Sequence, residues 1–235
     1  RIMGNDDRRS RGCLSTLTGL VPSAADTFAA WSWLKARVLF AGGLTLTIEG
    51  RSVVVLEPLG EGGFSSVHKC VDRAGTPYAL KRCFVQHDEH FLVAKTEVDM
   101  LKRLQHPNII RFFGSDPVEP QMGVPNIQVL MEHCDQSLIG IMKQRFTSKF
   151  TEEEVLSIFH NVVQAVCYLH SLTPPVAHRD LKADNVLLGA DRRYKLCDFG
   201  SCTSEAYEPQ GTREINLFQD EIDRNTTLEY RADRR

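Results

Sequence analysis

Apolar residues along the chain follow patterns typical of strands at several places beyond residue 52. β-branched residues crowd Val53–Val55 and Val67–Val71, and such crowding favours strands. The segment 126–131 is a further apolar strand that runs into a polar connection. The stretches 186–188 and 194–196 indicate the two arms of a hairpin. These patterns predict a sheet early in this region and a hairpin late in it.

Two segments carry apolar residues at helical spacing. The first stripe, between Val93 and Leu104, ends near His106-Pro107, because proline cannot continue a helix. The second helix has Thr151 as its N-cap, and Glu154 completes a capping box. The apolar positions of this second helix spread widely around its axis, so we expect the helix to be largely buried.

Composition restricts the function classes without choosing among them. The chain has 235 residues, of which 42% are hydrophobic and 25% charged, as in ordinary globular proteins. A formal charge of -2 argues against bulk binding of nucleic acid. The cysteines are scattered without a C-x-x-C pair, which favours a reduced, cytosolic chain. His87 and His90 lack further ligands nearby, so a solvated loop is favoured over a metal site.

Residues 1–51 are expected to form an extension ahead of the organised region. Their apolar stretch 28–48 is interrupted by basic residues and by a Gly-Gly pair, which argues against a helix that spans a membrane. A helix lying on a membrane surface, with Trp31 and Trp33 as anchors, is one alternative. A partly ordered extension that packs on the domain is the favoured interpretation.

A glycine-rich segment separates the first two predicted strands. Gly60, Gly62 and Gly63 lack a Cβ, so backbone N–H groups there can approach an anionic ligand closely. The segment runs from strand to strand rather than from strand to helix. It therefore favours the phosphate-covering loop of protein kinases over a dinucleotide-binding turn. A plain hairpin is the alternative, and the third glycine of the G-x-G-x-x-G pattern is here Ser65.

A lysine and a glutamate form the next candidate pair. Alternation in the segment 78–82 places Ala79 and Lys81 on one face of a strand. A lysine on a half-buried strand needs an anion, and Glu97 of the first helical stripe can supply it, whereas Asp99 points elsewhere around that helix. A kinase needs such a glutamate to hold the strand lysine against the nucleotide phosphates. A surface lysine is the alternative.

The segments "HRDLKADN" (178–185) and "CDFG" (197–200) carry the chemistry. They match the catalytic loop and the metal-binding motif of protein kinases. In phosphoryl transfer, Asp180 would accept and orient the substrate hydroxyl, and Lys182 would offer a cation to the transferred group. Asn185 and Asp198 would supply oxygen ligands to Mg²⁺.

The chain therefore resembles the eukaryotic protein kinase family from about residue 52 to its end. The resemblance implies an α+β, two-lobed fold that uses ATP and Mg²⁺. A small, mainly β N-lobe would span about 52–131, a hinge about 132–136, and a mainly α C-lobe 137–235. Lys182, two positions after Asp180, resembles the serine/threonine branch. The residues expected around ATP are Gly60, Gly62, Gly63, Ser65, Val67, Ala79, Lys81, Glu97, Met131, Glu132 and Cys134.

A narrower resemblance concerns the Numb-associated group of serine/threonine kinases, which includes adaptor-associated, cyclin-G-associated and yeast actin-regulating kinases. The segments "GEGGF", "DFGSCT" and "EIDRNTTLEYRA" are similar to motifs of that group. The resemblance implies phosphorylation of threonines in clathrin adaptor subunits, in the cytoplasm and at membranes through partners. Asp184, where much of the group has glutamate, and "YRADRR", where it has "YRAPE", depart from the pattern.

The same resemblance makes "TTLEYRA" the end of the activation segment. Thr227 would lie beside Asp180 and Lys182 and help to present the substrate. Because the Pro-Glu and the late helices of the family do not appear after it, we expect a truncated C-lobe and a disordered segment from Ser201 to Arg235. An inactive kinase fragment that acts as a nucleotide- or partner-binding module is the alternative function.

Overall fold

The computed structural model describes residues 44–85, 87–118, 126–145, 147–206, 211–227 and 230. These residues belong to one compact unit that runs from Gly43 to Arg235. The proposed membrane-surface helix with Trp31 and Trp33, and the final residues 231–235, lie outside the described ranges. Within those ranges, none of the helices has the length and apolar character needed to cross a membrane.

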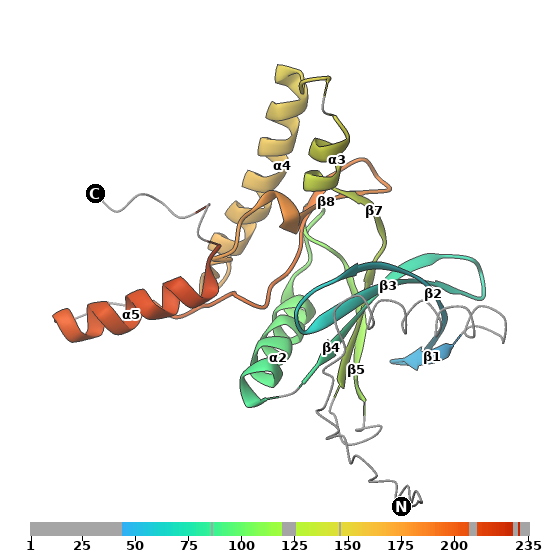
Figure 1. Ribbon diagram of the computed structural model, residues 1–235, viewed down its shortest axis with the longest axis horizontal. Coiled ribbons are helices and arrows are strands. Elements are labelled where there is room, and N and C mark those ends of the chain that lie inside the picture. Colours follow the sequence, from blue (N-terminus) through green and yellow to red (C-terminus); the bar gives the residue numbers. More distant parts are fainter. Residues whose placement is uncertain are drawn as a thin grey trace, which may run out of the picture. The chain divides into compact units, whose positions relative to one another are not determined.

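The first half of this unit is a curled antiparallel sheet (Figure 1). Its six strands lie in the order β1-β2-β3-β4-β6-β5. The sheet begins ahead of residue 52, because β1 pairs with β2. The strands are β1 Thr45–Ile48, β2 Arg51–Glu61, β3 Ser65–Asp72, β4 Pro77–Phe84, β5 Phe112–Val118 and β6 Asn126–Glu132.

Strand β2 leads directly into the glycine-rich segment. Its register with β3 shifts on both sides of Pro58, which cannot donate a ladder hydrogen bond. The turn then closes where the Gly62 amide donates to the Ser65 carbonyl over 2.7 Å. The glycines therefore form the tip of a hairpin between two sheet strands, as the sequence pattern predicts.

Helix α2, Asp88–Arg103, lies beside the sheet (Figure 1). Its buried residues are Ala94, Glu97, Val98 and Leu101, a spacing of three and four that defines one helical face. Val93 is half exposed, although the sequence pattern includes it in the buried stripe. The reason is that Val93 lies one position away from the register of the buried face.

The second half of the unit contains the helices and a small sheet in the order β7-β8-β9. The elements are β7 Cys134–Ser137, α3 Leu138–Gln144, α4 Glu152–Ser171, a short 3₁₀ helix Ala183–Asn185, β8 Val186–Gly189, β9 Tyr194–Leu196 and α5 Thr212–Asn225. The predicted hairpin is therefore present as β8 and β9. A mainly β part followed by this mixed helical part confirms the α+β, two-lobed kinase fold.

One hydrophobic core joins the two halves. Val98 and Leu101 of α2 belong to the same buried cluster as Leu169 of α4, Leu196 of β9 and Phe199. Burial of these side chains ties the sheet to the segment that carries Asp180 and Asp198. The core therefore fixes the distance between the two halves of the candidate site.

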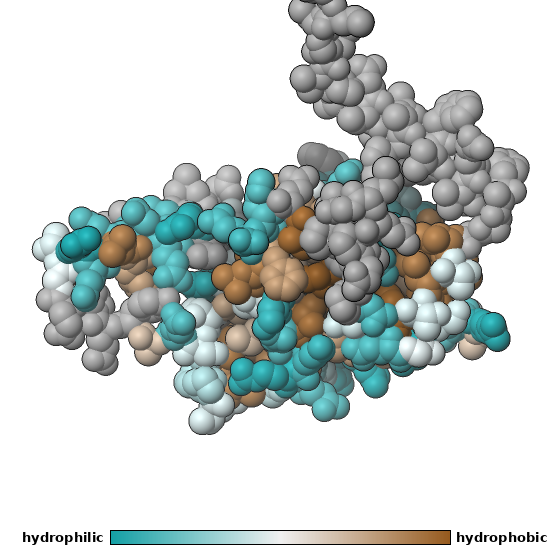
Figure 2. Space-filling model, turned by 90° about the horizontal axis from the view of Figure 1, so that it is seen from below, coloured by the Kyte–Doolittle hydropathy of each residue, from teal (hydrophilic) through white to brown (hydrophobic). Residues whose placement is uncertain are grey.

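Helix α4 confirms one prediction and corrects another. Thr151 caps it, and the reciprocal hydrogen bonds with Glu154 form the predicted capping box. The helix is not largely buried, however, since only Ala165 and Leu169 are fully covered. The exposed fraction of Phe159 is 65%, which shows that only one side of α4 packs on the core. Hydrophobic residues also reach the surface elsewhere, in patches among polar ones (Figure 2).

Helix α5 corrects the expectation of a disordered segment from Ser201 onward. Phe218, Glu221 and Ile222 are half buried at helical spacing, so one face of α5 is partly covered. The prediction of disorder rests on the absence of the family's Pro-Glu and late helices after "TTLEYRA", and it does not take the periodicity of residues 212–225 into account.

Candidate functional site

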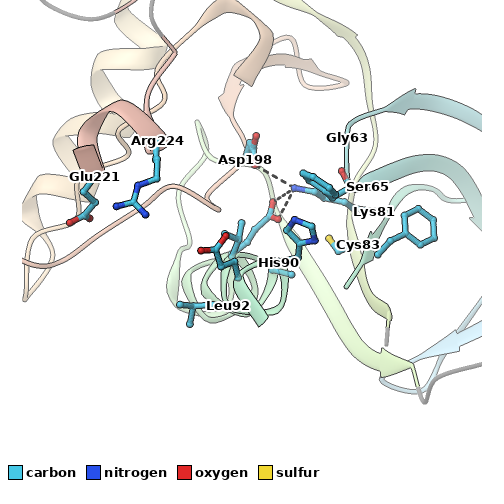
Figure 3. A pocket seen from close by; sticks show the side chains of 15 residues that line it. Gly63, Ser65, Lys81, Cys83, His90, Leu92, Asp198, Glu221 and Arg224 are labelled. Atoms are coloured by element: carbon cyan, nitrogen blue, oxygen red, sulfur yellow. Dashed lines mark hydrogen bonds and ion pairs between the residues drawn. The ribbon is translucent and has the colours of Figure 1, made fainter. Parts of the chain in front are cut away.

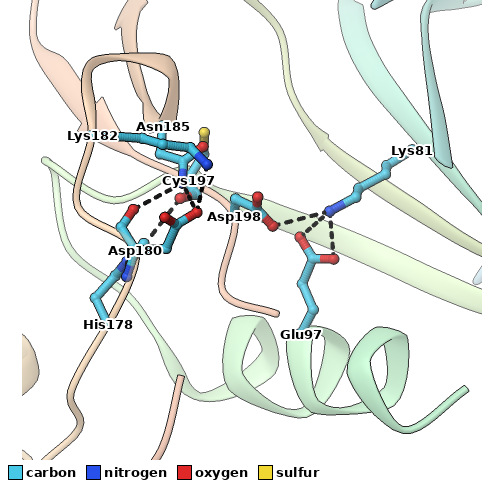
Figure 4. A network of polar contacts seen from close by, with 8 residues as sticks. All are labelled: Lys81, Glu97, His178, Asp180, Lys182, Asn185, Cys197 and Asp198. Carbon is cyan, nitrogen blue, oxygen red and sulfur yellow. Dashed lines mark hydrogen bonds and ion pairs between the residues drawn. The ribbon is translucent and has the colours of Figure 1, made fainter. Parts of the chain in front are cut away.

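The sheet and α2 bring Lys81 and Glu97 together. The Lys81 Nζ lies 2.6 Å from Glu97 Oε2 and 2.7 Å from its Oε1 (Figure 4). The Lys81 side chain is 14% exposed and that of Glu97 only 3%. Asp99 instead pairs with Lys95 on the outer face of α2, at 2.8 Å. The structure thus joins the residues that the sequence pattern paired and separates the one it excluded.

The ammonium group of Lys81 also contacts Asp198, whose Oδ1 lies 3.4 Å away. Burial works against the charge of Lys81, but Glu97 and Asp198 outweigh it and raise the pKa of this lysine above its ordinary value. Lys81 is therefore a permanent cation between two carboxylates. A cation held in this way can contact a phosphate without first being reoriented.

Asp180 is the centre of a second polar network. Its Oδ1 accepts a hydrogen bond from Thr227 Oγ1 over 2.6 Å, and its Oδ2 lies 2.8 Å from Lys182 Nζ. Lys182 also donates to Thr227 over 3.0 Å. The Asn185 amide nitrogen donates to Oδ2 of the same carboxylate, at 3.0 Å (Figure 4). The structure brings together all four residues.

These donors determine the charge of Asp180. Partial burial raises its pKa, but hydrogen bonds from Lys182 and Thr227 outweigh that effect and lower the pKa below its ordinary value. Asp180 is therefore ionised at neutral pH and can accept a hydrogen bond from an incoming hydroxyl.

Asn185 and Asp198 present oxygen atoms suited to a divalent cation. The amide nitrogen of Asn185 is engaged by Asp180, so its oxygen is the atom able to coordinate a metal. Asp198 has a backbone φ of 64°, a strained conformation that aims its half-exposed carboxylate toward Lys81. No group of three or more His, Cys, Asp or Glu side chains in the described ranges could hold a metal. Two protein ligands fit Mg²⁺, which usually takes its remaining ligands from phosphates and water.

His178 contacts the backbone on both sides of the candidate site, at Cys197 and at Asp180. Its ring Nε2 lies 3.1 Å from the Cys197 carbonyl oxygen, and its Nδ1 accepts a hydrogen bond from the Asp180 amide over 3.3 Å. A neutral ring protonated at Nε2 satisfies both contacts. Phe199 packs edge-on against His178 and is fully buried. The imidazole therefore links the backbone of the catalytic loop to that of the metal-binding motif.

The glycine-rich tip leaves space beside Lys81. A Cβ placed on Gly60 or Gly63 would meet no atom within 4 Å, and one on Gly62 would meet the Ser65 hydroxyl at 3.3 Å and the Ser65 carbonyl oxygen at 3.8 Å. Packing within the chain therefore does not demand glycine at Gly60 and Gly63. Val67 follows the tip in β3 and pairs with Lys81 in register. The open space suits a bulky anionic ligand.

A cavity of about 690 Å³ extends from this tip past Lys81 to α5 (Figure 3). Asp198 and Lys81 point toward each other within it, while Arg224 and Glu221 project from α5 (Figure 3). Its lining includes Gly63, Ser65, Lys81, Glu97, Asp198 and Arg224.

The expected hinge residues lie where β6 leaves the sheet. Met131 is buried and pairs in register with Ala79 of β4. The Glu132 amide donates to the Arg111 carbonyl oxygen, so this amide is not available to a nucleotide. Cys134 is not in an irregular connection, because it begins β7.

Two charged contacts near the site were not predicted from the sequence. Lys195 is buried in β9, where its Nζ lies 3.1 Å from Glu132 Oε1 and 3.2 Å from Asp191 Oδ2. Arg179 pairs with Glu221 of α5 at 2.6 Å. A lysine within the apolar hairpin pattern was a usable signal for the first contact. The second depends on α5, which was itself not predicted.

Comparisons with known proteins agree with this geometry. A family model described as "Protein kinase domain" matches residues 53–234. A probable serine/threonine-protein kinase of Dictyostelium discoideum is 38% identical over 196 residues, which cover 81% of this chain and 17% of that protein. Actin-regulating kinase PRK1 of Saccharomyces cerevisiae is 34% identical over 203 residues, which cover 83% of this chain and 25% of that protein. Serine/threonine-protein kinase sel-5 of Caenorhabditis elegans is 34% identical over 198 residues, which cover 81% of this chain and 18% of that protein. The chain thus spans at most a quarter of the length of these three relatives.

Proposed function

Since this chain belongs to the protein kinase family, we propose that it transfers the γ-phosphoryl group of ATP to serine and threonine hydroxyls of proteins. One observation carries the proposal: Asp198 contacts Lys81 of the Lys81–Glu97 pair and lies between that pair and Asp180 with its partner Lys182 (Figure 4). Few other functions would require this combination of a fixed cation, an ionised acceptor and two metal-binding oxygens.

In the proposed complex, the nucleotide lies between the glycine-rich tip and the hinge. Lys81, held by Glu97, contacts the α- and β-phosphates. The glycine-rich tip, Gly60–Gly63 with Ser65, covers the phosphates without the Gly62 amide, which already donates to the Ser65 carbonyl oxygen. Val67, Ala79 and Met131 enclose the adenine. Glu132 and Cys134 contribute backbone groups of the hinge, with the Glu132 carbonyl rather than its amide facing the base. Asn185 and Asp198 would hold Mg²⁺, which would supply neutralisation of the phosphate charge.

In the proposed transfer, the substrate hydroxyl oxygen forms a bond to the γ-phosphorus while the bond from that phosphorus to the β–γ bridging oxygen breaks. The hydroxyl proton passes to Asp180, and the electron pair of the broken bond leaves with ADP. Lys182 stabilises the charge on the transferred group, and Thr227 holds the Asp180 carboxylate in place. Most of the catalysis is then positioning and electrostatics that exist before substrate arrives.

The experiment that tests transfer compares the unsubstituted protein with Asp180→Asn. We expect the variant to bind ATP with unchanged affinity, because Asp180 contacts the hydroxyl and not the nucleotide. Single-turnover transfer should fall by about 10²- to 10⁴-fold, the usual contribution of a positioned proton acceptor. Transfer at an undiminished rate would contradict the role of Asp180.

The second candidate function is a binding module that holds nucleotide or a partner without transfer. The exposed apolar residues of α4 favour a partner at that surface, since large exposed patches are uncommon in isolated domains. ATP binding without measurable transfer in the unsubstituted protein would support this alternative.

For the substrate, we propose threonines of clathrin adaptor subunits, with the protein acting in the cytoplasm and reaching membranes through partners. The motifs similar to the Numb-associated group and the similarity to actin-regulating kinases support this choice. Adaptor-derived threonine peptides should be phosphorylated faster than their serine counterparts and than unrelated basic or proline-directed peptides. Equal rates on all of them would contradict the substrate while leaving the kinase proposal intact.

We also propose that the kinase domain spans residues 52–235, with the N-lobe at 52–131 and the hinge at 132–136. The family match over 53–234 and the end of β6 at Glu132 support these bounds. Pairing of β1 with β2 favours adding residues 45–51 to the domain.

A further inference from the structure

A groove of about 890 Å³ lies apart from the candidate active site and shares no lining residue with the cavity beside Lys81. We call it the second groove. It is bounded by the end of α2 and the connection that follows, the beginnings of β4 and β5, the end of β6, and the turn between β8 and β9. Its lining includes Tyr78, Leu104, Phe113, Glu132, Asp191 and Lys195.

The two carboxylates in the described lining of the second groove pair with the same lysine. Lys195 Nζ lies 3.1 Å from Glu132 Oε1 and 3.2 Å from Asp191 Oδ2, and the lysine side chain is 7% exposed. Lys195 therefore offsets part of the repulsion that these carboxylates would exert on an incoming anion.

Three further cations of the lining have no such partner. Lys102, Arg103 and Arg111 are exposed, and none of them forms an ion pair with a residue in the described ranges. His106 and His133 add no charge at neutral pH, because burial lowers the pKa of each. Four cations and two carboxylates thus line the described part of the groove, an excess of two positive charges in a chain whose formal charge is -2. This excess favours an anionic partner.

Helix stability accounts for only some of these cations. Lys102 and Arg103 lie in the last turn of α2, where positive charge complements the helix dipole. Arg111 lies outside the helix, and its guanidinium carbon is 5.1 Å from the centre of the Phe113 ring. The aromatic contact holds this guanidinium beside the groove without a carboxylate to neutralise it.

The apolar side chains of the second groove are recessed. Leu104, Ile109 and Tyr78 are buried, and Phe112 and Phe113 are half buried. Among the described residues, none of the large apolar side chains that protrude into solvent lines this groove. A flat lipid surface would not reach recessed side chains, whereas one side chain of an extended peptide would insert among them. The shape therefore favours a protein segment over a membrane.

Local contacts hold the connection that forms one wall of the groove. The His106 ring stacks on Tyr168 of α4, with 4.9 Å between the ring centres. The Tyr168 hydroxyl accepts a hydrogen bond from the Gln105 amide over 3.0 Å, and His106 Nδ1 accepts one from the Asn108 amide. A wall fixed in this way loses little conformational freedom on binding, which favours affinity.

We propose that the second groove docks an extended segment of a partner protein in which acidic residues flank one apolar side chain. The carboxylates of that segment pair with Lys102, Arg103 and Arg111, and its apolar side chain enters the recess beside Phe113. Charge complementarity selects the segment, and the recess fixes its register in the groove. Docking there involves neither nucleotide nor Asp180, so it does not depend on phosphoryl transfer.

The test measures binding of a fluorescein-labelled peptide to the whole chain by fluorescence anisotropy. In this probe, glutamates stand on both sides of a central phenylalanine. One control peptide has glutamine in place of every glutamate, and another has serine in place of the phenylalanine. The protein variant Arg103→Glu with Arg111→Glu reverses two exposed charges of the groove. Its matched control, Lys143→Glu with Lys149→Glu, reverses two exposed charges outside the groove.

We expect the probe to bind the unsubstituted protein, and more weakly as sodium chloride rises, because salt screens exposed charges. Arg103→Glu with Arg111→Glu should weaken binding at least about tenfold, since like charges then face the glutamates. The control variant should stay within about threefold of the unsubstituted protein, because distant exposed charges are largely screened. The serine peptide should bind at least about tenfold more weakly, the scale of an unburied phenylalanine, and the glutamine peptide should lose the salt dependence.

Two further measurements locate the binding. Saturating ATP with Mg²⁺ should not displace the probe, because the nucleotide is proposed to bind beside Lys81. Thermal midpoints of both double variants are compared with that of the unsubstituted protein. If the groove variant melts early, Arg111→Gln takes its place, and it should weaken binding by about threefold, the scale of one exposed ion pair.

The possible outcomes separate the docking proposal from the proposed function. Equal affinity of the groove variant and its control would overturn docking, and so would displacement of the probe by ATP. Binding to vesicles that contain phosphatidylserine, with loss of binding on Arg111→Gln and no binding of the probe, would overturn it in favour of a lipid surface. Failure of the kinase proposal would appear as absence of transfer and would leave these binding results unchanged.

Discussion

At the scale of single residues, the buried ion pair between Lys81 and Glu97 has two separable consequences. Lys81→Met removes the cation that we propose contacts the phosphates, so kcat/KM for ATP should fall sharply. It also leaves Glu97 buried without its partner, which should cost about 3 kcal/mol of unfolding free energy. Steady-state kinetics and urea unfolding measure the two effects independently.

The control for that prediction is the double variant Lys81→Met with Glu97→Leu. Replacing both charged groups by apolar ones should restore most of the stability without restoring activity. If stability and activity recover together, then Glu97 is not buried against Lys81 in the way that the structure shows.

His178 makes stability depend on pH. Burial lowers its pKa below the ordinary value of 6.5, so the folded protein resists protonation of this ring. The unfolded chain binds the proton more readily, so the stability that His178 contributes is complete above pH 6.5 and is lost as pH falls through it. The pKa values of His106 and His133 are also lowered by burial, and they add to the effect.

We therefore expect the thermal midpoint to fall between pH 7.5 and pH 5.5. His178→Asn should lower the midpoint at both values but reduce the difference between them. His170→Asn, at an exposed position of α4, is the matched control and should keep the full difference. An unchanged pH dependence in His178→Asn would rule out burial of a neutral His178 as its cause.

The sequence indicated most of the site at this scale because kinase motifs are local. The main site residues belong to short segments whose spacing can be read directly from the sequence. They are Lys81, Glu97, Asp180, Lys182, Asn185 and Asp198. The Lys195–Glu132 and Arg179–Glu221 contacts join positions far apart in the chain. No local pattern specifies such contacts, since they depend on how the halves of the fold pack.

At the scale of elements, the start of α4 depends on its capping box. Thr151→Ala removes the hydrogen bond to the Glu154 amide and leaves that N–H without its cap. The expected loss is about 1 kcal/mol of unfolding free energy, measured by chemical denaturation, with little change in KM for ATP. Ser148→Ala, outside the helix, should change neither quantity. A Thr151→Ala loss no larger than that of Ser148→Ala would mean that the cap is unimportant.

Helices α4 and α5 show where prediction of elements succeeds and where it fails. The bounds of α4 follow from its cap and its Pro174-Pro175 stop, both of which are local. The burial of α4 does not follow from local sequence. The apolar residues around a helix do not determine which neighbouring elements cover them. The periodicity of α5 is present in residues 212–225, but the expectation of disorder rests on the family pattern and not on this periodicity.

At the scale of the whole molecule, the exposed side of α4 should govern association of the isolated chain. Val155, Leu156 and Phe159 are each more than half exposed. Phe159→Ser should reduce concentration-dependent self-association in sedimentation experiments, because it removes the largest of these apolar groups. His160→Ser, at the next position, is the control. Equal association of both variants with the unsubstituted chain would place the interaction elsewhere.

The two-part architecture was predictable at this scale from the order of the motifs, and the packing between its parts was not. The sheet carries Lys81, the later segment carries Asp180 and Asp198, and the kinase resemblance implied both placements. Phe199 and Leu196 in the shared core hold these groups at working distance, and burial of that kind emerges only in three dimensions.

The contact between Lys195 and Glu132 also bears on motion. Glu132 ends the last strand before the hinge, whereas Lys195 belongs to the hairpin that carries the metal-binding motif. A rotation that opens the proposed nucleotide site by moving the sheet away from this hairpin would stretch the ion pair, in which Lys195 is buried. The attraction between Lys195 and Glu132 therefore opposes opening and favours return to the closed arrangement. Lys195→Met removes this ion pair. Release of ADP, which requires opening, would therefore be faster in that variant.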